Sequence, residues 1–267
     1  MSNKRFVLPT LLAAGGLALA ASFLPANASA VTLAADDAST STYDSGFDPG
    51  MNGGFGLEAW EINSSGANAG RFKGDSSSNG FGDSNGDGDI NTTDTMSMGV
   101  AWGLWANSGD SSEAIRPFST PLSVGDTLTF GMDNGFIDGG SAVGFSLRNA
   151  SDENVFEALY AGGAPAYQYF DAEGFKDTTI GFTSDGLNVS FSLTSSNSYD
   201  FSLEVVSSGD TYTTSGLLAA PSGGQAITEV RFFNNNAGSG ATNDAYFNSI
   251  LIDGPGSTRV ESWETYE

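Results

Sequence analysis

Two consecutive segments of this chain alternate apolar and polar residues without a break. They are 187–193 (LNVSFSL) and 199–205 (YDFSLEV). This period of two places every second side chain on the same face, which is typical of a strand with one face in a core and the other in water. The polar residues between them, 194–198, have the length and composition of a hairpin connection. We therefore predict an antiparallel pair of strands here.

The rest of the chain extends this pattern and offers little to a helix. Its 36 Gly residues are spread along the sequence, and no window keeps an apolar stripe of helical period. Further candidate strands are 127–132, 142–148, 155–160, 179–183, 211–218, 227–233 and 244–252, and 95–107 also reads as a strand with glycines. So many short strands most often form two packed sheets. We predict an all-β fold, a two-sheet antiparallel β-sandwich (jelly roll, concanavalin-like). A solenoid would need a short repeat, which the sequence lacks.

The N-terminal 30 residues predict export. Lys4 and Arg5 precede an apolar run, 6–24, and 28–30 (ASA) matches the cleavage site of a secretory signal peptide. We therefore assign 1–30 to a signal peptide, 31–46 to a disordered leader, 47–253 to the β-sandwich and 254–267 to a polar C-terminal tail. The leader assignment follows from its low-complexity composition of Ala, Ser, Thr and Asp. We expect a secreted, extracellular protein, and the absence of Cys means that no disulfides stabilise it.

The charge balance limits the possible partners. Nine Lys and Arg residues stand against 32 Asp and Glu residues, which gives a formal net charge of −23. Nucleic acids and anionic membrane surfaces bind clustered basic side chains, and the sequence has no such cluster. We expect no nucleic-acid partner and no membrane insertion. This acidity is typical of a bacterial exoprotein in salt water, where ions screen the repulsion between like charges.

One acidic segment has the spacing of a calcium-binding loop. In 83–94 (DSNGDGDINTTD), oxygen-bearing side chains fall at alternate positions, Gly88 permits a sharp turn, and Ile90 is the apolar anchor. The predicted ligands of Ca2+ are Asp83, Asn85, Asp87, Asp89 through its backbone carbonyl, Asn91 and Asp94. Asp94 stands where the usual loop ends in Glu, which shortens that arm. The alternative is a solvated acidic turn.

This loop resembles the calcium loop of dockerin modules and related EF-hand-like repeats. The resemblance covers only 83–94 and lacks both a second copy and the helix that follows in dockerins, so it implies the metal ligands and not the fold. The domain as a whole resembles secreted bacterial lectin-like β-sandwiches. This second resemblance rests on turn and core segments, namely 53–56 (GGFG), 102–109 (WGLWANSG), 132–135 (MDNG), 143–145 (VGF) and 233–240 (FNNNAGSG). It implies the sandwich fold more strongly than it implies a function.

The residue types present leave little room for catalysis. The chain has no His and no Cys, which excludes Ser-His-Asp and Cys-His nucleophile systems and His-ligated metal centres. Carboxylate pairs remain, and the Glu pairs at 58/61 and 261/264 lie near the ends of the predicted domain. We therefore expect that the protein is not an enzyme. The alternative is a polysaccharide-active glycoside hydrolase that uses paired carboxylates.

Aromatic residues are the candidates for sugar binding, because sugars stack their C–H faces on rings beside polar side chains. Trp102 and Trp105 should point to opposite faces of one strand, so at most one belongs in the core. The candidate ligand-binding residues are Trp105, Tyr167 and Tyr169; for each the alternative is a place in the core. We expect a polysaccharide, a cell-surface glycan or extracellular matrix as partner. A self-associating matrix subunit is the alternative function.

Overall fold

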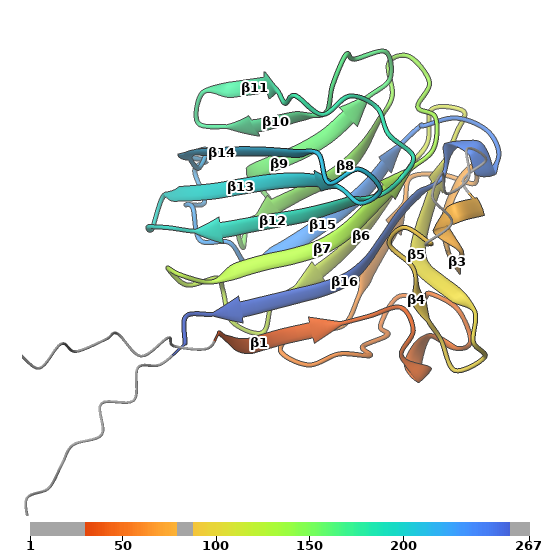
Figure 1. The fold of residues 1–267 in the computed structure, drawn as a ribbon, viewed down its shortest axis with the longest axis horizontal. Helices are drawn as coiled ribbons and strands as arrows, with labels where there is room; N and C mark the ends of the chain where they lie inside the picture. Colours follow the sequence, from red (N-terminus) through yellow and green to blue (C-terminus); the bar gives the residue numbers. More distant parts are fainter. Residues whose placement is uncertain (1–29, 79–87, 257–267) are drawn as a thin grey trace, which may run out of the picture.

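The computed structural model describes residues 30–78 and 88–256, and the statements below concern these residues (Figure 1). They form sixteen β-strands and three short 3-10 helices, with no α-helix among them. The strands make two sheets, in which every pairing is antiparallel. The predicted two-sheet antiparallel β-sandwich is confirmed.

Sheet A is the larger layer, with nine strands. In spatial order its main path is β14 (Thr211–Leu217), β13 (Ser198–Val205), β12 (Leu187–Leu193), β7 (Thr127–Asn134), β16 (Ala245–Gly254), β5 (Gly99–Ala106) and β3 (Ala69–Gly74). In addition, β1 (Val31–Asp36) pairs with β16, and β4 (Thr92–Thr93) pairs with β5.

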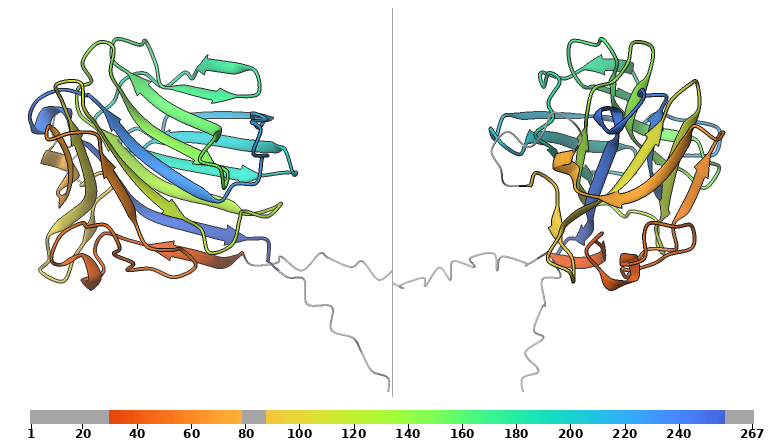
Figure 2. Two further views of the ribbon diagram at one scale, coloured as in Figure 1. Left: turned by 180° about the vertical axis from the view of Figure 1, so that it is seen from behind. Right: turned by 90° about the vertical axis from the view of Figure 1, so that its right-hand side faces the viewer.

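Sheet B has seven strands and packs against one face of sheet A (Figure 2). Its order is β11 (Gly174–Asp177), β10 (Gln168–Asp171), β9 (Asn154–Ala161), β8 (Ala142–Arg148), β15 (Glu229–Asn235), β6 (Ser111–Pro117) and β2 (Glu61–Ser64). The chain passes repeatedly from one sheet to the other, so β5, β6, β7 and β8 alternate between the layers. The 3-10 helices are Ser41–Tyr43, Ser76–Ser78 and Ala241–Asn243.

The strands with strict alternation form where the sequence predicts them. β12 and β13 pair in the register Leu187↔Val205 to Leu193↔Tyr199, as the hairpin pattern requires. The candidate strand at 179–183 is wrong, because this segment has no regular structure. In place of a strand pairing, the backbone of this segment forms a hydrogen bond with Tyr167, whose amide donates to the carbonyl of Ile180 at 2.8 Å.

Aromatic rings fill the space between the sheets. Near β5 and β16, Trp60, Trp102 and Phe247 lie in mutual contact, and the rings of Phe232 and Phe247 stack with centroids 4.1 Å apart. A second group of rings extends this core toward β10, β12 and β13: Phe145, Phe156, Phe191, Tyr199 and Phe201. Such rings bury large areas, which stabilises a sandwich that has no disulfide.

Residues 31–46 are ordered, which corrects the prediction of a disordered leader. β1 pairs with β16 from Val31↔Gly254 to Asp36↔Ile250, and Tyr43 is fully buried. Composition alone predicts disorder here, because it counts apolar residues and does not show how individual side chains pack. Ala34 is almost completely buried and lies against Gly56, where an added Cβ would be 2.7 Å from that of Ala34, and Asp36 has a specific partner.

That partner is Arg116 of β6, and the two side chains form an ion pair with no exposed surface. The guanidinium also donates to Asn52 Oδ1 at 2.7 Å and lies 4.9 Å from the ring centre of Trp60. The Tyr43 hydroxyl donates to the same carboxylate. Burial raises the pKa of Asp36 and lowers that of Arg116, while the charge of each partner opposes the other's shift. Segments 31–46 and 111–117 are therefore held together inside the molecule.

The ends of the chain fall largely outside the described residues. The predicted signal peptide, apart from Ala30, and the tail from 257 onward belong to that part. Among the residues that the structure describes, no helix is long and apolar enough to span a membrane.

Candidate functional site

The face of sheet A that points away from sheet B, here called the outer face, carries an open hollow of about 470 Å³. The alternation that buries the apolar residues of β12 and β13 turns polar ones toward this face. The outward-facing side chains that line the hollow are those of Thr129, Asn188, Ser190, Ser202, Glu204, Ser249 and the apolar Leu251. The hollow therefore offers hydroxyl, amide and carboxylate groups to a ligand, on a surface that is more apolar than polar.

The floor of the hollow is one line of cross-strand partners. Ser202 pairs with Ser190, Ser190 with Thr129, and Thr129 with Leu251. Partners in an antiparallel sheet share a face, so these side chains lie side by side across about 14 Å at the usual strand spacing. The side chains of Ser202, Ser190 and Thr129 are short, so the surface of the sheet is recessed where they lie.

The predicted calcium loop borders the hollow through Ile90. This side chain is buried, as expected for an apolar anchor, and it packs with Ala101 and Tyr246. Gly131 lines the hollow, and a Cβ added there would lie 2.8 Å from the Cβ of Ile90. The absence of a side chain at Gly131 thus makes room for Ile90, through which the loop packs on the sheet. Gly88, with φ of 84°, supplies the turn that the motif requires.

The structure describes only the second half of the predicted ligand set. Asp83, Asn85 and Asp87 lie outside the described residues. Asn91 has other partners: its Oδ1 accepts the amide of Ser76 at 2.9 Å, and its Nδ2 donates to Asp75 Oδ1 at 2.6 Å. Within 30–78 and 88–256, no three acidic side chains gather closely enough to hold a metal ion. A calcium site at this loop therefore depends on 83–87.

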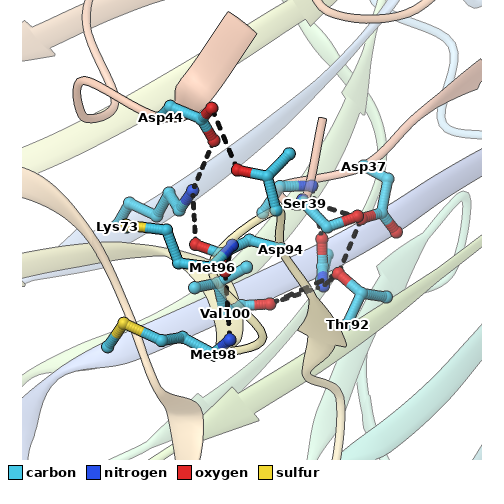
Figure 3. Close-up of polar contacts among 12 residues, drawn as sticks. Asp37, Ser39, Asp44, Lys73, Thr92, Asp94, Met96, Met98 and Val100 are labelled. Carbon is cyan, nitrogen blue, oxygen red and sulfur yellow. Dashed lines mark hydrogen bonds and ion pairs between the residues drawn. The ribbon is translucent and has the colours of Figure 1, made fainter. Parts of the chain in front are cut away.

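Asp94 is held at the turn between β4 and β5 (Figure 3). Its Oδ1 accepts the amides of Met96 at 2.9 Å and Met98 at 3.0 Å, and its Oδ2 lies 3.4 Å from Lys73 Nζ. These bonds, the one from the Met98 amide first, lower the pKa of Asp94. A metal ion at the twelfth position of the loop would have to draw Asp94 away from these partners.

The exit of the loop is fixed by Asn248 of β16, a fully buried side chain. Its Nδ2 donates to the carbonyls of Ile90 and Val100, each at 3.0 Å, and its Oδ1 accepts the amide of Ala38 at 2.9 Å. One amide side chain thus joins the loop, β5, β16 and the segment that follows β1. Asn234 does the same on β15, donating to the carbonyls of Leu104 and Asn243.

Asp37 adds a second anchor, next to Thr92 and Ser39 (Figure 3). Its carboxylate accepts the hydroxyl of Thr92 at 2.6 Å, that of Ser249 at 2.8 Å and the amide of Ser39 at 2.8 Å. Burial alone would raise the pKa of Asp37, but these hydrogen bonds outweigh it and the pKa is lowered. The carboxylate therefore stays ionised and holds β4 against the end of β1.

The predicted aromatic platforms lie in different places. Trp102 is in the core, and Trp105 is half-buried on the outer face, over Gly70 of β3, whose added Cβ would lie 2.7 Å from the Trp105 ring. Tyr167 and Tyr169 are buried, which corrects their assignment as exposed ligand-binding rings. Tyr169 lies on β10 and points inward, and the Tyr167 hydroxyl donates to the buried Asn134.

Carboxylates do not converge in the hollow. Glu204 is the one acidic residue among the described residues that line it. Of the Glu pairs noted in the sequence, Glu58 accepts the hydroxyl of Ser119 and Glu61 lies exposed on β2 in sheet B; 261/264 lies outside the described residues. Asp244, which precedes β16, was not among the predicted site residues. Burial raises its pKa to about 7, a property that no sequence pattern signals.

No protein-family model matches the sequence, and no curated protein matches it either. Solved structures of similar fold include an uncharacterised protein from Mycobacterium paratuberculosis, with a TM-score of 0.43 and 13% identity over 77% of this chain and 96% of that chain. A family 16 glycosyl hydrolase protein from Mycobacterium smegmatis gives a TM-score of 0.38 and 11% identity over 62% and 79% of the two chains. The galectin LEC-6 from Caenorhabditis elegans gives 0.33 and 14% over 51% and 89%. The fold assignment rests on the strand order itself.

Proposed function

We propose that this protein is a secreted, calcium-binding and non-catalytic β-sandwich that binds carbohydrate on the outer face of sheet A. The observation that supports this most is the hollow floored by Ser202, Ser190 and Thr129. Sugars are recognised by hydroxyl and amide groups that match their own hydroxyls, and an open hollow admits a chain from the side. Export is proposed from the sequence of residues 1–30.

The proposal of a binding protein and not an enzyme follows from the lining of the hollow. Glycoside hydrolysis ordinarily requires two carboxyl groups on either side of the scissile bond, about 5 to 9.5 Å apart. Among the described residues that line the hollow, Glu204 is the one carboxylate, so the pair that hydrolysis requires is not present there. A single carboxylate can accept hydrogen bonds from sugar hydroxyls without cleaving the chain.

Calcium is proposed to act on the same face. An ion bound by Asp83, Asn85 and Asp87 would neutralise carboxylates that otherwise repel one another. It would thereby favour the docked position of Ile90 against Gly131, at the border of the hollow. Binding of metal and folding of the loop would then be linked.

The carbohydrate site is tested by filling the hollow. We expect the mature protein to bind a glycan on an array, and Ser190→Arg to lose at least tenfold in affinity because the long side chain covers the floor. Ser196→Arg, in the exposed β12–β13 hairpin, is the matched control and should bind as the wild type does. Wild-type affinity in Ser190→Arg would show that this hollow is not the site.

The metal site is tested by the melting temperature with and without calcium. Calcium should raise the melting temperature of the wild type, and Asp83→Ala with Asp87→Ala should abolish that rise while the sandwich stays folded. The control is Asp200→Ala with Asp210→Ala, which removes two exposed carboxylates elsewhere. A rise of wild-type size in the first double variant would mean that calcium binds at another place.

Self-association is a second candidate function, and the edge strand β14 favours it. Its sequence, Thr-Tyr-Thr-Thr-Ser-Gly-Leu, has no charged residue and no Pro, whereas β3 at the opposite edge of sheet A carries Arg71 and Lys73. The amide of Ala172 donates to the Leu217 carbonyl and so occupies one end of the free edge. The remainder, 211–215, lacks the charges that usually prevent edges from pairing.

Sedimentation at increasing protein concentration tests this second function. A second copy pairing on β14 would raise the mass, and Thr213→Lys should restore the monomer because it places charges side by side at the edge. Ser196→Lys adds the same charge away from the edge and should leave the association unchanged. A monomeric wild type at about 1 M salt, where repulsion is screened, would exclude assembly through this edge.

A further inference from the structure

Phe55 is an exposed aromatic residue with a fixed backbone. Its side chain is 55% exposed, yet its amide and carbonyl both bond to Ala35 of β1, each at 3.0 Å. Gly54 permits this close approach, because a Cβ there would lie 1.9 Å from the carbonyl oxygen of Ala35. A large apolar ring that is held in place and left in water is a feature of binding surfaces.

The strand register places Phe55 on the line of residues that floors the hollow. Leu251 pairs with Ala35, and Ala35 forms an isolated antiparallel bridge with Phe55. The complete line of partners is Ser202, Ser190, Thr129, Leu251, Ala35 and Phe55. At the usual strand spacing it is about 24 Å long, which is the length of several sugar units.

A second hollow lies along the same line. It has a volume of about 530 Å³ and is bounded by Phe55, Gly53 and Gly54 on one side and by Ser249 and Leu251 on the other. Ser249 and Leu251 also line the first hollow, so the two hollows share a rim on β16. Both hollows expose more apolar than polar surface; the first has three hydroxyl side chains on its floor, and the second ends at an aromatic ring.

The charges of this face disfavour the binding of an anionic glycan. Six basic residues lie in the described part of the molecule, and each is in an ion pair with Asp or Glu: Arg71, Lys73, Arg116, Arg148, Lys176 and Arg231. None of them lines either hollow. The carboxylates that face a ligand there are those of Glu204 and Asp37, which repel uronate or sulfate groups; that of Asp36 is buried and paired with Arg116.

We propose that the outer face of sheet A binds a neutral, unbranched glycan that crosses the strands from β13 to β1 and stacks a terminal or internal sugar on Phe55. This inference rests on the proposed carbohydrate function and adds the ligand class, its direction and its aromatic contact. Short oligosaccharides occupy only the hydroxyl-lined hollow. Longer ones gain affinity by reaching Phe55.

Affinity electrophoresis through gels that contain single polysaccharides tests the proposal. The neutral polymers are laminarin, galactomannan, xyloglucan and dextran, and the anionic ones are alginate and polygalacturonate. We expect retardation by at least one neutral polymer and by neither anionic one. Phe55→Ala should weaken it by about tenfold, as removal of one stacking ring does, while Phe175→Ala, which removes an equally exposed ring from sheet B, should not.

Oligosaccharides of increasing length, cut from the retarding polymer, separate the two proposals. Phe55→Ala should bind the shortest ones as the wild type does and lose the gain that length provides, whereas Ser190→Arg should lose both. Wild-type affinity of Phe55→Ala for the longest oligosaccharide, or retardation by the anionic polymers alone, would overturn the inference and leave the carbohydrate function standing. The absence of retardation by every polymer would overturn both.

Discussion

Several of the best-buried side chains in this molecule are polar, and they join segments that lie far apart in the sequence. Arg116 and Asn248 have no exposed surface, and Asp36 has almost none. Each forms hydrogen bonds with residues from at least two other segments. A buried polar group without such partners would cost free energy, so these residues specify the fold as well as stabilise it.

The ion pair between Arg116 and Asp36 gives the clearest prediction for a single residue. Arg116→Met should reduce the free energy of unfolding by about 3 to 5 kcal/mol, because it leaves the Asp36 carboxylate buried without its counter-charge. Urea unfolding measures this. Adding Asp36→Asn to Arg116→Met should recover part of the loss, since the uncompensated charge is then gone. A loss below about 1 kcal/mol for the single variant would contradict a buried pair.

Asp244 should make stability depend on pH in the opposite direction to most carboxylates. Its pKa is raised by burial from 3.8 to about 7 in the folded protein. The folded state therefore binds the proton more tightly than the unfolded state, and the resulting stabilisation is complete below about pH 4 and is lost as pH rises toward 7. Melting temperatures between these limits should fall for the wild type relative to Asp244→Asn. Parallel curves for the two proteins would show that Asp244 ionises normally.

At the scale of elements, the sequence predicts a strand best where one face meets water. β12, β13 and β8 were predicted almost to the residue because polar and apolar side chains alternate in them or their ends are marked by turn residues. The strands that were missed are short or rich in Ala, Ser and Gly: β1, β2, β3, β4, β6, β10 and β11. β1 gains its order from partners in β6 and β16. Pairing over such distances leaves no local pattern.

The candidate site follows the same rule. The loop with Gly88 and Ile90 could be found from its spacing, because all its residues are close in the sequence. The line from Ser202 to Phe55 could not, because it depends on the registers of four strand pairings and one isolated bridge, among segments that run from Ala35 to Leu251. Phe55 and Ser190 carry no signal by themselves.

β1 provides a test at this scale, because the ordered strand and the disordered leader predict different results for neighbouring residues. Ala34 is buried and Leu33 is 45% exposed. Ala34→Asp should lower the free energy of unfolding by about 3 kcal/mol or more through a buried, unpaired charge, and Leu33→Asp by about 1 kcal/mol or less. Denaturant unfolding of the two variants measures the difference. Equal, small effects would mean that residues 31–36 do not form part of the fold.

At the scale of the whole molecule, charge is the dominant property. The chain has a formal net charge of −23, and every basic residue in the described part is already paired with a carboxylate. The remaining carboxylates repel one another, and the compact state brings them closer together than the unfolded state does. Stability should therefore depend on the ionic strength of the solution.

We expect the melting temperature to rise between about 0.05 and 1 M NaCl, because the screening length falls from more than 10 Å to about 3 Å. Differential scanning calorimetry measures this. Choline chloride should act like NaCl, since screening depends on ionic strength and not on the kind of cation. A melting temperature that falls with salt would show that the ion pairs, and not the excess carboxylates, dominate the electrostatics of this protein.

The pairing of β1 with β16 has a consequence for how the chain is made. Apart from the bridge at Phe55, the first strand of the described chain, 31–36, pairs with the last one, 245–254, so the ribosome must release nearly the whole polypeptide before these two strands can meet. Contacts that close so long a loop form late and slowly. Until β16 has been made, β7 and β5 also lack the strand that pairs with both of them, and the two halves of sheet A are not joined. A nascent chain that cannot complete its fold stays extended enough to thread through a narrow channel, which suits the export proposed from residues 1–30.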